Sequence, residues 1–246
     1  IYSSKNNNFE IIEIINKNEN KNSFSIETII LSLSNKKSSN KLKLELDYKH
    51  SVTTILNATK PREEIDSLNK WRAKVGIAQS EIISKEATER GASMHVFIEK
   101  YLLGKLNLDL LGDNRIERIM ADQIIENGLK NRLQEIWGCE STLYYPGKYA
   151  GAADCLGIYE NYQTCIDFKQ SNKPRKHEWN TQYYMQLGAY SLAHNTVYGT
   201  HIDQGVILVC TKDNIFQKFV IYGEELKDYQ NKFLERVEKY YSQKKN

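Results

Sequence analysis

The chain has 246 residues, of which 26% are charged and 40% hydrophobic, and its formal net charge is only +3. This length is ample for one large domain with a hydrophobic core. No run reaches the roughly 18 to 20 uncharged apolar residues of a membrane helix, so the composition argues against a membrane protein. A net charge of +3 does not by itself indicate a nucleic-acid binder. Any such function has to be argued from particular residues.

Residues 1–45 are rich in Asn, Lys and Ser and contain short apolar runs such as FEIIEII and TIILSL. We interpret them as an irregular N-terminal appendage with a few short strands. The domain that carries the function then covers residues 46–246. The first residue is Ile1 rather than Met, and residues 1–40 show no signal-peptide pattern. Whether a targeting segment precedes them is left open.

Residues 51–136 have a helical pattern. The run PREEIDSLNKWRAKVG predicts a helix with Pro61 at its start and Gly76 at its end. The following run, SEIISKEATERGASMHVFIEKYLLG, continues the helical period. The run DNRIERIMADQIIENGLKNRLQEI predicts a long amphipathic helix that Asp113 or Asn114 would cap.

Residues 137–246 predict a sheet-centred core. Three strand-like runs, WGCESTLYY, YAGAADCLGIY and TCIDFKQ, are joined by tight turns. A helix over about residues 179–194 comes next, and GVILVC and FQKFVIY are two further strands. The closing run EELKDYQNKFLERVEKYYSQKK is an amphipathic helix. This order predicts an α/β fold with one central mixed sheet flanked by helices.

Two carboxylates lie inside otherwise apolar strands, Asp154 in the second strand of the meander and Asp167 in the third. Burying them is costly unless a positive charge joins them. Neighbouring strands would bring both to one hard divalent cation, Mg²⁺ or Mn²⁺. Lys169 follows Asp167 by two residues, so both side chains point to one face, where the ammonium can stabilise a phosphate. The alternative is a structural Asp–Lys pair on a sheet surface.

Two further groups are candidates. Glu140, in the first strand, either binds a second metal, holds a water or is a solvated strand residue. His95 shares a helix face with Gly91 and Glu99 by the i, i+4 spacing, and Gly91 would let that helix approach another backbone closely. A lone helical histidine is usually a packed or surface residue, so spacing alone leaves the role of His95 open.

Gln186 and Tyr190 also share a helix face. A glutamine in an apolar helix needs hydrogen-bond partners, which a phosphate, a metal-bound water or nearby backbone would supply. The loop SNKPRKHEWN, with Lys173, Arg175 and Lys176, is basic and is either a phosphate-binding loop or simply solvated.

The sequence contains four cysteines, none of them in a C-x-x-C pair: Cys139, Cys155, Cys165 and Cys210. A structural zinc site or an iron–sulfur cluster usually shows such close spacing, so we expect neither. We expect reduced, largely buried thiols of an intracellular protein.

In chain order, these residues form a set that begins with a helical histidine (His95) and an acidic strand residue (Glu140). Asp154 follows, and twelve residues separate it from the Asp-x-Lys motif of Asp167 and Lys169. The set ends with the helical Gln-x-x-x-Tyr motif of Gln186 and Tyr190. This set resembles the PD-(D/E)XK nuclease superfamily in its RecB-like branch. The strings GAADCLG, IDFKQSNKP and QLGAYSLAHN are similar to phage exonucleases and to mitochondrial genome maintenance exonucleases. The resemblance covers residues 51–241.

The resemblance implies four protein ligands for Mg²⁺ or Mn²⁺: His95, Asp154, Asp167 and the backbone carbonyl of Phe168. The catalytic residues that it implies are Asp154, Asp167, Lys169, Gln186 and Glu140, with Lys169 as the catalytic lysine. We expect DNA contacts from Ser171, Lys173, Arg175, Lys176, Tyr190 and Trp71. Some RecB-like nucleases hold an iron–sulfur cluster with cysteines closely spaced after the core, but no cysteine follows Cys210 here.

The function expected is therefore a Mg²⁺- or Mn²⁺-dependent DNA exonuclease acting on single-stranded ends, in the cytoplasm of a bacterial or phage-infected cell rather than in a mitochondrion. The helices before the sheet, with Trp71 and Phe97, would arch over a strand and stack its bases. The alternatives are a double-stranded DNA exonuclease of the phage-recombination type and a non-catalytic DNA-binding module with a nuclease fold.

Overall fold

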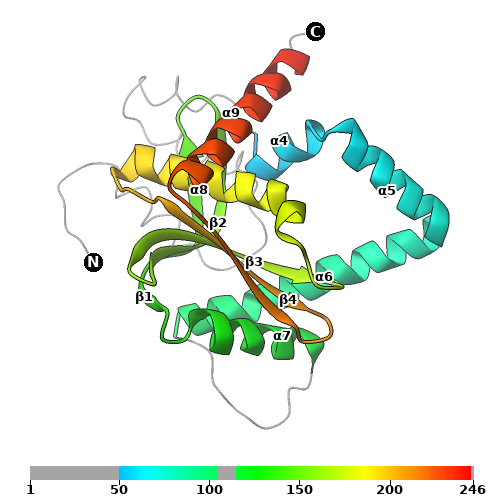
Figure 1. Cartoon of the computed structure of the whole chain (residues 1–246), viewed down its shortest axis with the longest axis horizontal. Coiled ribbons are helices and arrows are strands. Elements are labelled where there is room, and N and C mark those ends of the chain that lie inside the picture. The colour runs from blue at the N-terminus through cyan, green and yellow to red at the C-terminus, as the bar shows by residue number, and fades with distance from the viewer. Residues whose placement is uncertain (1–49, 105–114, 245–246) are drawn as a thin grey trace, which may run out of the picture. The chain divides into compact units, whose positions relative to one another are not determined.

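Figure 1 shows the computed structural model of the chain, which describes residues 50–104 and 115–244. The chain divides into two units, residues 1–47 and 48–246, and the described residues all belong to the second. The predicted appendage over residues 1–45 and the expected caps Asp113 and Asn114 lie outside the described residues. They stay predictions.

Five strands of the described chain form one mixed sheet in the order β1-β2-β3-β4-β5. Neighbouring strands are antiparallel except β3 and β4, which run parallel and are connected through a helix. The predicted α/β class with a central mixed sheet flanked by helices is confirmed. The strand bounds are β1 Leu133–Tyr145, β2 Tyr149–Tyr159, β3 Tyr162–Ser171, β4 Gln204–Thr211 and β5 Phe216–Tyr222.

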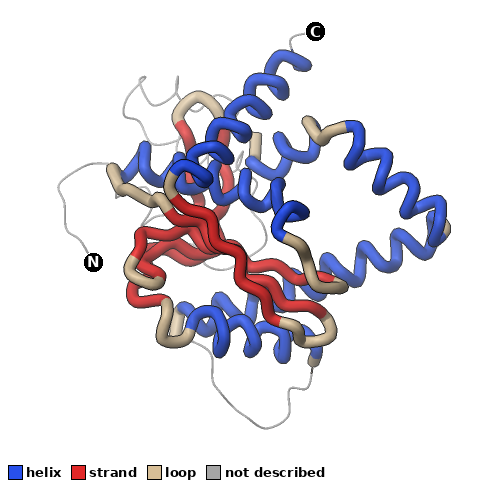
Figure 2. Tube along the Cα trace, viewed as in Figure 1, coloured by secondary structure: helices blue, strands red, loops and turns tan. Residues whose placement is uncertain are grey.

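Helices cover both faces of the sheet, as Figure 2 shows. Alternate residues of β4 divide between the two cores, because successive side chains of a strand point to opposite faces. Ile207 and Val209 pack with helices on one face, and Val206 and Leu208 with helices on the other. The first face carries α4 (Val52–Ala58), α8 (Thr181–Tyr198) and α9 (Glu224–Lys244), and the second carries α6 (Ile77–Leu102), α7 (Ile116–Ile124) and the π-helical turn Ile125–Leu129.

One predicted helix is confirmed in its bounds and another is wrong at its end. Helix α5 spans Arg62–Val75, between Pro61 and Gly76, as expected. The helix predicted to continue through Ile136 instead ends in the π-helical turn, and β1 begins at Leu133. Asn131 turns the chain there with a φ of 60°, and pairing with β2 then extends the following residues. Strand pairing, a non-local interaction, overrides the local helical period.

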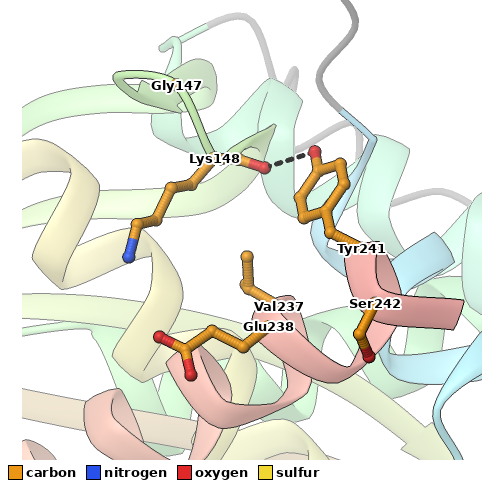
Figure 3. Close-up of a pocket in the computed structure, with 6 residues that line it drawn as sticks. All are labelled: Gly147, Lys148, Val237, Glu238, Tyr241 and Ser242. Atoms are coloured by element: carbon orange, nitrogen blue, oxygen red, sulfur yellow. Dashed lines mark hydrogen bonds between the residues drawn. The ribbon is translucent and has the colours of Figure 1, made fainter. Parts of the chain in front are cut away.

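The cysteines of the described chain are all free; Cys155, Cys165 and Cys210 are buried and Cys139 is half-buried. None of the helices in the described ranges is long and apolar enough to cross a membrane. A surface cavity of about 370 Å³ opens between the β1–β2 turn and the end of α9 (Figure 3). Its lining contains none of the candidate residues: Gly147, Lys148, Val237, Glu238, Tyr241 and Ser242.

Candidate active site

A fork in the sheet positions the two predicted strand carboxylates. The ladder between β2 and β3 ends at the pair Cys155–Ile166, so the next residues, Asp154 and Asp167, stand where the strands separate. Beyond this point the backbone amide of Phe168 does not pair with a carbonyl of β2. It donates to the side chain of Asp154 instead, at 2.8 Å from Oδ2. The unpaired backbone group is thus satisfied by one of the acids. Asp154 and Asp167 thus lie at the same fork, and the expectation that they share one cation stays a prediction.

The fork also lets groups from both faces of the sheet meet. Lys169 lies 5.0 Å from the ring centroid of Tyr183 on α8, so Asp167 and Lys169 point to the α8 face. His95 comes from α6 on the opposite face, and its Nε2 lies 2.8 Å from the carbonyl oxygen of Phe168. A continuous ladder would separate these groups. The separation of β2 and β3 removes that barrier.

Asp167 and Lys169 form a buried ion pair, with Lys169 Nζ donating to Asp167 Oδ1 at 2.6 Å. Asp167 is only 3% exposed, and this burial, with the charge of Asp154, raises the pKa of its carboxyl. Burial alone would lower the pKa of the Lys169 ammonium, but the charges of Asp167 and Asp154 raise it above its usual value. Lys169 therefore keeps its proton and its charge.

The second oxygen of Asp167, Oδ2, is buried and has no hydrogen-bond partner in the described structure. A buried carboxylate oxygen without a partner is costly. A positive or donating group from outside the described residues would satisfy it.

His95 is oriented by two kinds of neighbour. Because the Phe168 carbonyl can only accept, Nε2 of His95 carries the hydrogen of that bond. Nδ1 faces the carboxylates, 3.7 Å from Glu140 Oε1 and 3.8 Å from Asp154 Oδ2. Burial lowers the pKa of His95, yet the nearby carboxylates of Glu140 and Asp154 outweigh it, so the pKa is raised overall. In the neutral form, the Nδ1 lone pair points at the space between two acids.

His95, Glu140 and Asp154 could together hold a metal ion, since one ligand atom from each lies within 4.8 Å of the others. Imidazole and carboxylate donors suit a divalent cation such as Mn²⁺ or Mg²⁺. The donor set and the unpartnered oxygen of Asp167 both fit a cation at this fork. The geometry places Glu140 beside His95 and Asp154, two of the expected ligands, rather than apart from them.

Glu140 reaches this group through an irregular backbone. It follows a register shift in β1 between Ile136 and Gly138 and has a φ of 47°, in the left-handed region. Such a conformation costs a non-glycine residue of order 1–3 kcal/mol. Its neighbours in β1, Cys139 and Ser141, pair with Cys155 and Ala153 of β2, so Glu140 stands opposite Asp154.

Sequence reasoning missed Arg90, which joins α6 to the end of β3. Its guanidinium donates to Gln170 Oε1 at 3.1 Å and 3.0 Å and to Asn172 Oδ1 at 2.5 Å. A Cβ at Gly91 would lie 3.2 Å from Gln170 Cγ, so the glycine lets the helix approach a side chain of β3 and not, as had been expected, another backbone. The available signal was the Arg-Gly pair one turn before His95. These contacts set the position of His95 against β3.

Two candidates, Tyr190 and Gln186, lie on α8. The Tyr190 hydroxyl has its pKa raised by burial and by the charges of Asp167 and Asp154. The Tyr190 ring packs where a side chain at Gly151 would clash, 2.8 Å from an added Cβ. Gln186 is half-buried, and within the described chain its amide makes no recorded hydrogen bond. The expected role of both residues, support of bound substrate, stays a prediction.

The remaining residues expected to contact DNA differ in whether their side chains are free to bind a ligand. Lys173 and Lys176 are exposed. Arg175 is occupied, because its guanidinium donates to Asn180 Oδ1 and to the carbonyl of Trp179. The Ser171 hydroxyl donates to the carbonyl of Lys173.

The two aromatic residues expected to stack bases are placed differently. Trp71 is half-buried on α5. Phe97 is only 8% exposed and lies in the core against α7, so its expected role in base stacking is wrong.

Comparison with known proteins places the chain beside exonucleases. No family model matches it. It is 27% identical over 218 residues to mitochondrial genome maintenance exonuclease 1 of Homo sapiens, covering 84% of this chain and 62% of that protein. It is 29% identical over 215 residues to the Mus musculus protein of the same name, covering 84% and 63%. The chain thus spans about three fifths of the length of these relatives, and the expected resemblance to them is confirmed.

A solved structure described as a phage-related exonuclease from Haemophilus somnus 129PT covers 80% of this chain and 94% of its own, with 14% identity and a TM-score of 0.38. A similarity with so low an identity and TM-score supports no conclusion about function. The mitochondrial name of the curated relatives does not favour the cytoplasmic localisation expected from the sequence.

Proposed function

We propose that this protein is a Mg²⁺- or Mn²⁺-dependent deoxyribonuclease that hydrolyses phosphodiester bonds from the ends of DNA. The observation that carries the proposal is the cluster of His95, Glu140 and Asp154 within 4.8 Å, next to the ion pair of Lys169 and Asp167. The exonuclease names of the curated relatives support it.

His95, Glu140 and Asp154 would hold the cation, with the unpartnered oxygen of Asp167 available beside them. A divalent cation, when bound, supplies positive charge against the phosphate oxygens and makes a water more acidic. The Phe168 amide and carbonyl hold Asp154 and His95 in place, because each forms a 2.8 Å hydrogen bond to one of them. The site is thus preorganised by backbone groups.

Lys169 would act through its charge. Its pKa is raised by two carboxylates, so it keeps its proton and cannot serve as a general base. One N–H is directed at Asp167, and the remaining N–H groups can donate to a phosphate oxygen as negative charge develops. Asp167 would position this ammonium.

The preference for single-stranded ends rests on a helical arm, residues 62–90, which comprises α5 and the first half of α6. Figure 1 shows it projecting from the sheet. None of the residues of α5 is buried. The arm is joined to the body at both ends, by the Gln182 amide donating to Glu64 and by Arg90 donating to Gln170. We propose that a DNA end passes beneath this arm, with Trp71 on its path.

The test is digestion of end-labelled linear and circular single strands with Mn²⁺, Mg²⁺ or EDTA. We expect the linear strand alone to be degraded, and only with metal. Asp167→Ala and Lys169→Ala should each reduce the rate by about 100-fold or more. Lys218→Ala, which removes a surface ion pair with Glu160, is the matched control and should leave the rate unchanged.

Three results would contradict the proposal in different ways. Full activity in Lys169→Ala would contradict the site, and cleavage of circles would contradict the requirement for an end. Faster digestion of double-stranded than of single-stranded ends would favour the phage-recombination type of exonuclease. Metal-dependent binding without any cleavage would favour the non-catalytic DNA-binding module.

A further inference from the structure

Trp179 is a large aromatic side chain left 48% exposed on the short 3₁₀ helix His177–Asn180, between β3 and α8. Two ammonium groups lie against its ring, Lys173 Nζ at 5.8 Å and Lys176 Nζ at 5.6 Å from the centroid. No carboxylate of the described chain pairs with either lysine. The indole and the two lysines thus form an exposed surface, and no carboxylate of the described chain covers it.

The loop that carries these three side chains is rigidly built. The Arg175 amide donates to Gln217 Oε1 at 2.7 Å, and Gln217 Nε2 donates back to the Arg175 carbonyl at 3.0 Å. The Arg175 side chain donates to Asn180, which is fully buried, and to the carbonyl of Trp179. The backbone under Trp179 is therefore fixed, while Lys173 and Lys176 extend into solvent. An exposed aromatic ring with two ammonium groups against it suits a ligand that offers a flat face and negative charge.

The position of the loop connects it to the candidate active site. Lys169 Nζ lies 5.0 Å and the Arg175 guanidinium 4.8 Å from the ring centroid of Tyr183. One tyrosine thus contacts both the buried lysine of the site and the arginine that supports Trp179. A strand that presents a phosphate to Lys169 would continue over this surface.

We propose that Trp179 forms a stacking subsite for one unpaired nucleobase of single-stranded DNA, with Lys173 and Lys176 binding the phosphates on either side of that base. The inference rests on the proposed function, since it concerns the strand cleaved at the same site. A base stacks on the indole face. The two ammonium groups, which lie near the outer limit of a cation–π contact, move from the ring to the phosphates.

The experiment measures binding without cleavage. Wild type and variants are titrated against a fluorescein-labelled twelve-nucleotide oligothymidylate in EDTA at several salt concentrations. We expect Trp179→Ala to weaken binding by about tenfold with no change in the salt dependence, and Trp179→Phe to restore most of the affinity. Lys173→Ala and Lys176→Ala should each reduce the slope of log K against log salt by about 0.7.

Two substitutions serve as matched controls. Tyr162→Ala removes an exposed aromatic side chain at the opposite end of β3, and Lys239→Ala removes an exposed lysine on α9. Neither should change affinity or slope. An abasic nucleotide moved along the oligonucleotide should weaken binding to wild type at one position, and that loss should disappear in Trp179→Ala.

The subsite and the nuclease can fail separately. Unchanged binding by Trp179→Ala, or no binding of the oligonucleotide by wild type, overturns the subsite. Cleavage by wild type together with unchanged binding by Trp179→Ala leaves the nuclease standing and overturns the subsite alone. Binding that depends on Trp179 without cleavage in Mn²⁺ overturns the nuclease and supports the subsite.

Discussion

At the scale of single residues, Glu140 shows a conflict between stability and the proposed metal site. Its left-handed backbone is unfavourable for glutamate, and its carboxylate lies opposite that of Asp154. Both features destabilise the chain when no cation is bound, because one is backbone strain and the other is repulsion between like charges. A cation between His95, Glu140 and Asp154 would account for both.

Replacing Glu140 with asparagine should therefore stabilise the metal-free protein. Asparagine tolerates positive φ better than glutamate does, and the substitution also removes a negative charge. We expect the free energy of unfolding in EDTA to rise by about 1 kcal/mol, measured by urea denaturation, while Mn²⁺ binding weakens.

The matched control for this prediction is Glu160→Asn. Glu160 has a similar φ of 48° but pairs with Arg132 and Lys218 instead of facing another acid. This substitution should leave Mn²⁺ binding unchanged. A fall in the stability of Glu140→Asn in EDTA would contradict the interpretation.

His194 gives a prediction about pH. Burial against Trp137 and Tyr198 lowers the pKa of His194 to about 4. Thr200 donates its single hydroxyl hydrogen to Asn195, so it accepts one from Nδ1 of a neutral His194. Between pH 6.5 and 4 the unfolded chain binds a proton that the folded chain does not, so stability falls as the pH falls. We expect this group to contribute a loss of about 2 kcal/mol.

The measurement compares urea denaturation of wild type and His194→Gln across that range of pH. The difference between the two proteins isolates the histidine from the carboxylates, which titrate in both. His201→Gln, at an exposed histidine, should follow the wild-type curve. An equal fall in stability in His194→Gln would contradict the assignment.

At the scale of elements, local pattern predicted strands and helices well where each element is uniform. The bounds of β2 and β5 agree with the runs YAGAADCLGIY and FQKFVIY, because turn residues bracket a continuous β pattern. The fork between β2 and β3 was not predictable, since it depends on where a ladder between two strands stops. The backbone of Glu140 and the contacts of Arg90 depend on pairing and packing in the same way.

The sequence did allow the ligand types to be predicted, because acids in apolar strands are unusual wherever the strands lie. Spacing alone left the role of His95 open, since its neighbours Phe168, Glu140 and Asp154 lie far away in the chain, and only the family resemblance implied a ligand there. The three-dimensional arrangement brings His95 to these residues, and its role as a metal ligand stays a prediction.

Helix α5 should be among the least stable elements of the described chain. It buries none of its 14 residues, whereas all eight residues of β4 are buried. Local opening therefore exposes little apolar surface in α5. In native-state hydrogen exchange, we expect amides of α5 to exchange through local fluctuations and amides of β4 only through global unfolding.

The contrast within α6 serves as the internal control. Its first half belongs to the arm, while Met94, Phe97 and Ile98 lie in the core. Protection should rise along the helix from Ile77 towards Ile98. Protection of α5 equal to that of β4 would show that the arm is packed against a part of the chain that the contacts do not reveal.

At the scale of the whole molecule, the net charge of +3 conceals a separation of charges. Three acids, Glu140, Asp154 and Asp167, lie around His95 at the fork. Exposed lysines lie on the loop that follows β3. Nearly balanced totals are compatible with a nuclease, because one sign of charge binds the cation and the other binds the substrate.

The stability of the whole protein should consequently depend on divalent metal. A cation that binds the folded chain and not the unfolded one stabilises it by RT ln(1 + [L]/Kd), about 2.7 kcal/mol at a hundredfold excess over Kd. Here it would also relieve the repulsion between Glu140 and Asp154. We expect the Tm to rise with Mn²⁺ concentration and to return to its starting value when EDTA is added.

The increase should be lost in Asp154→Asn, which removes a charge while keeping nearly the same shape, and it should persist in Glu160→Gln, at an acid that pairs with Arg132 and Lys218. Because the readout is thermal unfolding, it does not depend on cleavage of any substrate. An equal rise in Asp154→Asn would mean that Mn²⁺ binds elsewhere on the chain.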